Sequence, residues 1–282
     1  SVASFCVFFI CQTIKSLTFK FQALIGIAAM VSEHIRKMTG WHWIGLYGAI
    51  LVAWGVLYAM SLSVGDLREL RAIYGAEFWA TLCVVSPDGA GFFRLFLMWS
   101  LMSVAMMAPT ALPAFATYDD LGAVAQTNLW KLIVGYLVVW IGFSLLASGL
   151  QMALFVYGAV DQLGQSTSRY LSAALLAIAG GYQFSHVKEA CLSKCRAPLT
   201  FFMQYFDEGA WRNGLRLGLV CLGCCWALMC LAFVGGVMNL VFMGLATVLM
   251  VVEKLPQIGT YITKPLGYAL LCGAALIALG LI

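Results

Sequence analysis

Charged residues are scarce in this chain. Only 10% of its 282 residues are charged and 63% are apolar, whereas a soluble domain usually carries about 25% charged residues. This shortage predicts an integral membrane protein whose main surrounding is the lipid bilayer. We interpret the net charge of +4 by its distribution across the membrane, and we expect no nucleic-acid partner.

The groups that carry most enzyme chemistry are also lacking. The three histidines, His34, His42 and His186, lie outside or at the edges of the apolar runs, which excludes a bis-histidine haem in the bilayer. Acidic residues lie in loops or at the ends of apolar runs, so an intramembrane carboxylate relay has no support. No phosphate-binding loop, dinucleotide fingerprint or Ser-His-Asp order is visible. We therefore do not expect an enzyme.

Long apolar runs are abundant and predict an all-α, polytopic membrane helical bundle. We expect about seven transmembrane helices, plus an amphipathic surface helix over 66–88. The expected transmembrane helices cover residues 43–62, 92–115, 130–157, 170–184, 213–234, 237–252 and 265–282. The runs over 213–234 and 237–252 must be separate helices. A single helix over 213–252 would be about 60 Å long, which is twice the hydrocarbon thickness of about 30 Å. Gly235-Gly236 is the expected turn between them.

The distribution of positive charge predicts the topology. With seven spans, most Lys and Arg residues fall on the side of the N-terminus, and positive residues favour the cytoplasmic side. We therefore expect a multi-pass protein of the bacterial inner membrane, with the N-terminal side of the first helix in the cytoplasm and the C-terminus outside. Residues 1–38 are an extension whose placement the sequence leaves open, and residues 39–282 are expected to form a single membrane domain.

Sulfur residues gather in the expected helix over 213–234. Cys221, Cys224 and Cys225 are three and four residues apart, so they share a helix face, and Met229 lies one turn further along. Soft sulfur ligands on one face suit a soft ion, above all Cu(I). The competing interpretation is that these residues are apolar fillers of the core.

A second pair of thiols lies in the polar, basic segment that follows the expected helix over 170–184. Cys191 and Cys195 are one helical turn apart, beside Lys188, Lys194 and Arg196. Nearby cations lower the pKa of a thiol and favour the metal-binding thiolate. This pair is therefore a candidate clasp for a linearly coordinated ion, with simple packing as the alternative.

The expected helix over 92–115 carries a row of methionines. Met98, Met102 and Met106 recur at four-residue steps, and Met107 follows them. If this helix enters from the outside, Met102 and Met106 lie at a depth similar to that of Cys221, where thioethers would oppose thiols. Such a stripe is also typical of ordinary packing.

Three further residues are expected to shape the helices. Pro109 and Pro113 should bend the far half of the expected helix over 92–115. Asn239 is expected to be a buried amide in a hydrogen bond between helices.

Several short segments together resemble a known bacterial family. They are Met98-Trp99, Met102, Ala105-Met106-Met107, Pro109, Pro113, Tyr182-Gln183, Lys188, Cys191-Leu192, Cys195-Arg196-Ala197-Pro198, Gly214, Gly218, Cys221-Leu222-Gly223-Cys224-Cys225-Trp226, Gly235-Gly236-Val237-Met238-Asn239 and Glu253-Lys254. With these segments the chain resembles the DUF2182 group of predicted metal-binding integral membrane proteins, some of whose members are labelled copper chaperones. The resemblance covers roughly residues 43–282 and implies a polytopic helical protein with a metal role. Ser185-His186-Val187 stands where the family pattern has Thr-Pro-Leu, which leaves open whether His186 adds a ligand.

The leading hypothesis is a membrane protein that binds Cu(I) and holds it in, or delivers it to, a membrane copper enzyme. The candidate metal ligands are Cys191, Cys195, Cys221, Cys224, Cys225, Met229, Met102, Met106 and Met107. One alternative is a structural accessory subunit of a larger membrane complex that binds no metal. Another is a small-solute transporter, since helix interruptions such as Gly180-Gly181 are of the kind that transporters use.

Overall fold

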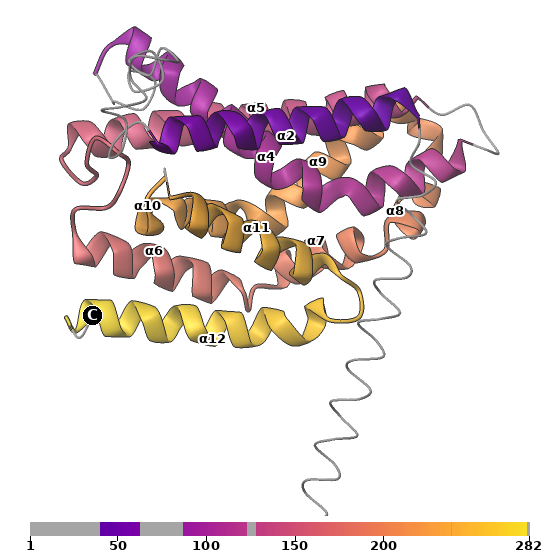
Figure 1. The fold of residues 1–282 in the computed structure, drawn as a ribbon. Coiled ribbons are helices and arrows are strands. Elements are labelled where there is room, and N and C mark those ends of the chain that lie inside the picture. The colour runs from indigo at the N-terminus through magenta and orange to yellow at the C-terminus, as the bar shows by residue number, and fades with distance from the viewer. Residues whose placement is uncertain (1–39, 63–86, 123–127, 238, 281–282) are drawn as a thin grey trace, which may run out of the picture. The chain divides into compact units, whose positions relative to one another are not determined.

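The computed structural model describes residues 40–62, 87–122, 128–237 and 239–280. Helices make up nearly all of this part of the chain, and Val160 and Ser166 form an isolated β-bridge. The helices are α2 (Trp41–Leu62), α4 (Gly89–Leu121), α5 (Leu129–Val156), α6 (Arg169–Tyr182), α7 (His186–Arg196), α8 (Pro198–Gln204), the 3₁₀ turn η2 (Phe206–Glu208), α9 (Gly209–Cys230), α10 (Ala232–Gly235), α11 (Leu240–Lys254) and α12 (Gly259–Ala278) (Figure 1). The expected extension over 1–38 and nearly all of the expected surface helix over 66–88 lie outside the described residues.

The chain divides into two compact units, Ser1–Gly45 and Leu46–Ile282. In the first unit the structure describes only residues 40–45, which include the first turn of α2. All helices that carry the candidate metal ligands belong to the second unit.

Five helical runs are long and apolar enough to cross a membrane. They are Trp41–Ser61, Gly89–Leu121, Leu129–Val156, Phe206–Gly235 and Gly259–Ala278. The prediction of a multi-pass, all-helical membrane protein is therefore confirmed. A helix is present at each of the seven expected positions, but α6 has 14 residues and α11 has 15. At about 1.5 Å per residue they are shorter than the hydrocarbon thickness of about 30 Å. The count of seven spans stays a prediction.

The expected turn between the two sulfur-rich runs is confirmed. Helix α10 ends at Gly235, and Gly236 has a φ of +89°, which a residue without Cβ adopts at little cost. Asn239 then caps α11, because its side-chain oxygen accepts a hydrogen bond from the Phe242 N–H at 3.1 Å. Asn239 is exposed, so the prediction of a buried interhelical amide is wrong. The first N–H groups of a helix lack partners within it, and here the amide supplies one.

Helix α4 continues through both of its prolines. Pro109 has no N–H, so the carbonyl oxygen of Ala105 loses its usual helical partner. The indole Nε1–H of Trp54 donates to that oxygen at 2.9 Å. The side chain of Trp54 in α2 therefore compensates for the proline in α4, and the expected bend stays a prediction.

Glycines allow two helix pairs to approach closely. In the α5–α9 pair, a Cβ on Gly135 would lie 2.7 Å from the carbonyl oxygen of Trp211, and a Cβ on Gly214 would overlap the carbonyl of Leu132. In the α6–α12 pair, a Cβ on Gly180 would lie 2.9 Å from Leu271 Cγ. Small residues at such contacts are typical of membrane helices.

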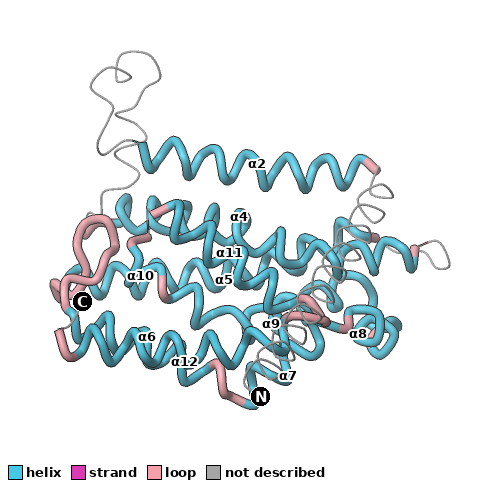
Figure 2. Tube along the Cα trace, turned by 60° about the horizontal axis from the view of Figure 1, so that its bottom comes forward, coloured by secondary structure: helices cyan, strands magenta, loops and turns pink. Residues whose placement is uncertain are grey.

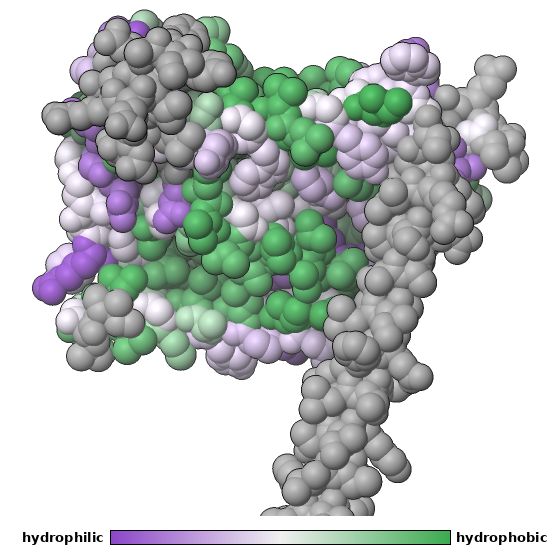
Figure 3. Space-filling view, in the orientation of Figure 1, coloured by the Kyte–Doolittle hydropathy of each residue, from purple (hydrophilic) through white to green (hydrophobic). Residues whose placement is uncertain are grey.

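The remaining contacts place α11 among the other helices. Helices α6 and α12 lie side by side in both views (Figures 1 and 2). Helix α11 contacts α4, α7, α9 and α12. Hydrophobic residues cover most of the middle of the face shown in Figure 3, and hydrophilic residues gather near the ends of the helices. The sulfur residues of α9 lie in the interior of this assembly.

Candidate metal centre

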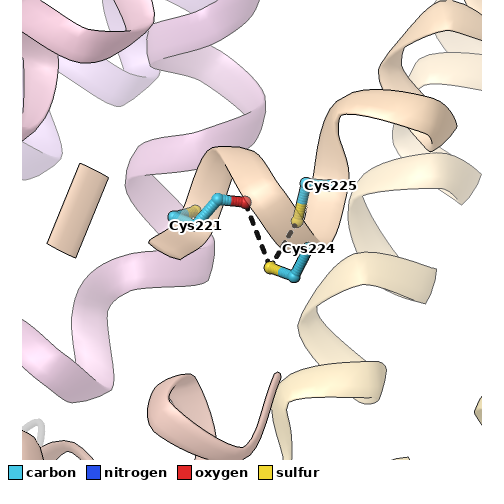
Figure 4. Close-up of side chains that lie close together, drawn as sticks. All are labelled: Cys221, Cys224 and Cys225. Atoms are coloured by element: carbon cyan, nitrogen blue, oxygen red, sulfur yellow. Dashed lines mark hydrogen bonds between the residues drawn. The ribbon is translucent and has the colours of Figure 1, made fainter. Parts of the chain in front are cut away.

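Three thiols of α9 converge in the core of the membrane body. We call Cys221, Cys224 and Cys225 the cysteine cluster; each is only 1% exposed, and their Sγ atoms all lie within 4.8 Å of one another. The Sγ atoms of Cys224 and Cys225 are 3.2 Å apart, and the Cys224 thiol donates to the carbonyl oxygen of Cys221 at 3.1 Å (Figure 4). Zinc–sulfur bonds are about 2.3 Å long, so three sulfurs around an ion with bonds of that length are about 4 Å apart. Small side-chain rotations would bring these three thiols to that spacing.

Within the described ranges of the chain, the cysteine cluster is the only group of three or more His, Cys, Asp or Glu side chains whose ligand atoms lie this close. It follows directly from the spacing in the sequence, because residues i, i+3 and i+4 share a helix face. The three thiols therefore share one face of α9, as their spacing in the sequence predicts. Met229 is buried in the same helix, one turn beyond Cys225.

Polar groups from three other helices surround the sulfur of Cys221. The Nζ atom of Lys254, at the end of α11, lies 2.9 Å from Cys221 Sγ and donates to Thr110 Oγ1 of α4 at 2.6 Å. The hydroxyl of Tyr136 in α5 lies 3.1 Å from the same sulfur. Buried charges require partners, and the Lys254 ammonium can offset the negative charge of a metal–thiolate group. Cys221 is therefore the thiol of the cluster that has a cation, the Lys254 ammonium, within hydrogen-bond distance.

A buried ion pair lies one residue away from this contact. Lys188 Nζ of α7 donates to the two carboxylate oxygens of Glu253 at 3.1 and 2.9 Å, and both side chains are 1% exposed. Arg196, also in α7, donates through Nε to the carbonyl oxygen of Glu253 at 3.0 Å and through Nη2 to Thr263 Oγ1 at 3.2 Å. The ion pair and these hydrogen bonds therefore hold α7 against the end of α11 and against α12.

These contacts of α7 place its two thiols, Cys191 and Cys195, beside the cysteine cluster of α9. Residues 186–196 form a helix, α7, which packs against α9. A Cβ on Gly223 would lie 2.6 Å from the Sγ of Cys191, and Cys195 lies close enough to Cys224 for the two thiols to interact electrostatically. The two groups of cysteines, which the sequence presents as separate candidates, are neighbours in the fold.

The expected effect of the basic residues on Cys191 is not observed. Burial raises the pKa of the Cys191 thiol, and the nearby charge of Lys194 lowers it only in part. The prediction of a thiol with a lowered pKa is therefore wrong for this residue, because removal from water outweighs the attraction of the cation. Cys191 lies in a helix that packs against α9, whereas the sequence suggested a polar, basic loop.

The methionines of α4 are buried, and the printed side-chain contact of α4 with the cluster comes from another residue of this helix. Met102, Met106 and Met107 are at most 3% exposed, yet α4 packs mainly on α5. The α4 side chain next to Cys221 is that of Thr110, whose Oγ1 is 4.0 Å from the sulfur. Met107 contributes its carbonyl oxygen, which accepts a hydrogen bond from the Tyr136 hydroxyl at 2.9 Å. These contacts leave a ligand role for the thioethers a prediction.

Sequence reasoning missed three residues of the site and left one open. Lys254 was interpreted as the end of a helix, and Thr110 and Tyr136 gave no signal, although Glu253-Lys254 belongs to the segments that carry the family resemblance. His186 is exposed at the start of α7, and the residue of that turn that reaches the interior is Lys188. The presence of Glu253-Lys254 among the segments that carry the family resemblance is the signal that would have singled out Lys254.

A family of copper chaperones, PpoB2, matches residues 96–277 of the chain. The matched part begins in α4 and ends in α12, so it contains the cysteine cluster, the thiols of α7, Tyr136 and Lys254. The chain matches no curated protein and no solved structure. The family match agrees with the resemblance found in the sequence and with a cluster of soft ligands inside a membrane protein. This chain therefore belongs to the PpoB2 family of copper chaperones.

Proposed function

We propose that this membrane protein binds Cu(I) at the cysteine cluster and delivers it to a membrane copper enzyme. The observation that carries the proposal is the convergence of three buried thiols within 4.8 Å of one another. Thiolates are the soft ligands that Cu(I) prefers, and the family to which the chain belongs is one of copper chaperones. We do not assign a catalytic step to the protein.

The thiols of α7 extend this site toward one end of the bundle. In the proposal, Cys191 and Cys195 capture the ion at the cytoplasmic face of the bacterial inner membrane and pass it to Cys224 in the adjoining helix α9. The predicted topology, with seven spans and the C-terminus outside, puts α7 on that face. Met229 lies one turn beyond the cluster and is a candidate for a weaker additional ligand.

A chaperone must also release its cargo, and the number of thiols suits this need. Cu(I) is satisfied by two or three sulfur ligands, while α7 and α9 together bring five thiols into one neighbourhood. A thiol that is not bound to the ion is then always available to replace one that is. The ion can therefore move by ligand exchange, without passing through a free, uncoordinated state.

The direct test is the copper content of purified protein. We expect protein prepared with copper under reducing conditions to retain copper, and the double variant Cys224→Ser, Cys225→Ser to bind it about a hundredfold more weakly, which corresponds to about 2.7 kcal/mol. Cys230→Ser is the matched control, because Cys230 lies on the same helix but is only partly buried. It should retain copper at the level of the unaltered protein.

Two outcomes would contradict the proposal. Unaltered protein that carries no copper would remove its basis, and so would a double variant that retains copper as well as Cys230→Ser does. Co-purification of a partner in a fixed ratio, with no metal present, would instead support a structural accessory subunit. X-ray absorption at the copper edge would identify sulfur as the ligand atom independently of copper content.

A further inference from the structure

A line of buried polar side chains joins α4 to α5 on the side away from α7. Ser103 of α4 and Ser144 of α5 are hydrogen-bonded at 2.9 Å. Further along, the indole Nε1–H of Trp99 donates to Gln151 Oε1 at 2.7 Å. All four side chains are at most 1% exposed. Burying polar side chains inside an apolar membrane protein costs free energy, unless these side chains stabilise the packing of helices or bind a solute.

The row of methionines in α4 runs along the same line. Met98, Met102 and Met106 are at most 3% exposed. An α-helix turns by about 100° per residue, so Met102 and Met106 fall on the same side of α4 as Trp99 and Ser103. We call the buried side chains of Trp99, Met102, Ser103, Met106, Ser144 and Gln151 the α4–α5 seam.

One end of the seam is at the cysteine cluster. Thr110 lies one turn beyond Met106 on the same side of α4, and it contacts both Lys254 and Cys221. Tyr136, one helical turn before Trp140 on α5, lies 3.1 Å from the Cys221 sulfur. An ion that leaves Cys221 toward α4 therefore passes Thr110, which is one helical turn from Met106 of the seam.

The other end of the seam lies beneath the connection between α5 and α6. A Cβ on Gly164 of that connection would lie 2.5 Å from Gln151 Nε2. From Thr110 to Trp99 the helix advances about 16 Å, which is about half of the hydrocarbon thickness of about 30 Å. The seam thus leads from the interior toward the end of the bundle opposite to α7.

The chemistry of the seam suits a Cu(I) ion in transit. Thioethers are soft ligands for Cu(I), and they are uncharged, so a bond from copper to a thioether is weaker than one to a thiolate and is readily exchanged. The indole rings of Trp99 and Trp140 flank the line, and indole faces attract cations.

We propose that the α4–α5 seam is a path by which Cu(I) leaves the cysteine cluster for the opposite end of α4 and α5. The inference rests on the proposed function, because it takes the cluster as the starting point. In each step a bond from copper to a thiolate or thioether sulfur breaks as a bond to the next thioether forms, and copper remains in the +1 state. The thiolate of Cys221 that is left behind is paired with the ammonium of Lys254, 2.9 Å away.

The test measures passage separately from binding. The purified full-length protein is placed in lipid vesicles that enclose a chromogenic Cu(I) chelator, and Cu(I) is added outside as a weak complex. The test variant is Met102→Leu with Met106→Leu, which keeps side-chain volume, and volume-conserving swaps are tolerated best. The matched control is Met152→Leu in α5, because Met152 is only partly buried and does not belong to the seam.

We measure bound copper and copper entry into vesicles for each protein, and we expect entry per bound copper to slow by about tenfold or more in the double variant. Met152→Leu should change neither quantity. A double variant that moves copper at the unaltered rate would overturn the inference, and so would unaltered, copper-loaded protein that moves no more copper than vesicles without protein. If the double variant does not fold, Met102→Leu alone is measured in the same way. Unaltered protein that binds no copper would instead refute the proposed function itself.

Discussion

Two helix groups of this protein both contain cysteine, but they use it differently. In α7, α9 and α11, five thiols come together beside a buried ion pair and the ammonium of Lys254. In the α6–α12 pair, Gly180 lets the backbones approach, and Cys272 of α12 is exposed. The contrast teaches that a thiol is a candidate ligand when other thiols and a compensating charge converge on it. Its presence in an apolar helix is not sufficient.

The same contrast exists within α9. Cys225 is 1% exposed and belongs to the cluster, whereas Cys230, less than two turns further on, is only partly buried. Burial raises the pKa of ordinary thiols in proteins and keeps them neutral, so an isolated buried cysteine behaves as a small apolar side chain. Position on the helix face, and not the helix itself, separates the two roles.

The largest expected effect concerns the ion pair that distinguishes the first group. Lys188→Met would leave the carboxylate of Glu253 buried without its cation, which should lower the free energy of unfolding by about 3–5 kcal/mol. The matched control is Arg216→Met, because the Arg216–Glu208 pair is partly exposed and such pairs contribute about 0–1 kcal/mol. Unfolding in detergent, followed by circular dichroism, measures both. Equal losses would show that the buried pair has no special role in holding α7.

A smaller effect is expected where α7 meets α9. Gly223→Ala would place a Cβ 2.6 Å from Cys191 Sγ, so the Cys191 side chain or α7 must shift, at a cost of about 1–3 kcal/mol for overpacking. We expect weaker copper retention as well, because the thiols of α7 move away from the cluster. Gly181→Ala is the control, since nothing lies within 4 Å of a Cβ there. The prediction fails if both variants retain copper equally in competition with a Cu(I) chelator.

The smallest effect is expected in the α6–α12 pair. Cys272→Ser changes an exposed thiol, and surface substitutions usually change stability by less than about 0.5 kcal/mol. Copper content, measured by mass spectrometry, and the unfolding transition should both match those of the unaltered protein. A loss of copper in this variant would erase the distinction between the two helix groups.

Some parts of the fold follow from local pattern alone. The apolar run over 130–157 predicts α5 closely, since α5 covers Leu129–Val156. The turn at Gly235-Gly236 follows from length, because the run before Glu253 is too long for one helix. The cysteine cluster follows from helical periodicity. Each of these depends on residues close together in the sequence, and each is confirmed.

Other parts were wrong or missed because they depend on distant contacts. Asn239 was expected inside a helix interface, but the helix begins one residue later and uses the amide as its cap. The pKa of the Cys191 thiol was expected to be lowered by nearby cations, but α7 packs against α9 and burial raises this pKa. Element boundaries and burial decide both outcomes, and neither is encoded in the residue types nearby.

The sequence by itself determined that this is a helical membrane protein with a sulfur-rich face on α9, because composition and periodicity are local properties. Only the tertiary structure decided which groups join that face. Lys254 contacts Cys221 across 33 positions of the chain and Thr110 across 144. Such contacts form because a buried ammonium must find partners wherever the packing of helices supplies them. The same packing brings the thiols of α7 to Cys224 and so completes the candidate copper site.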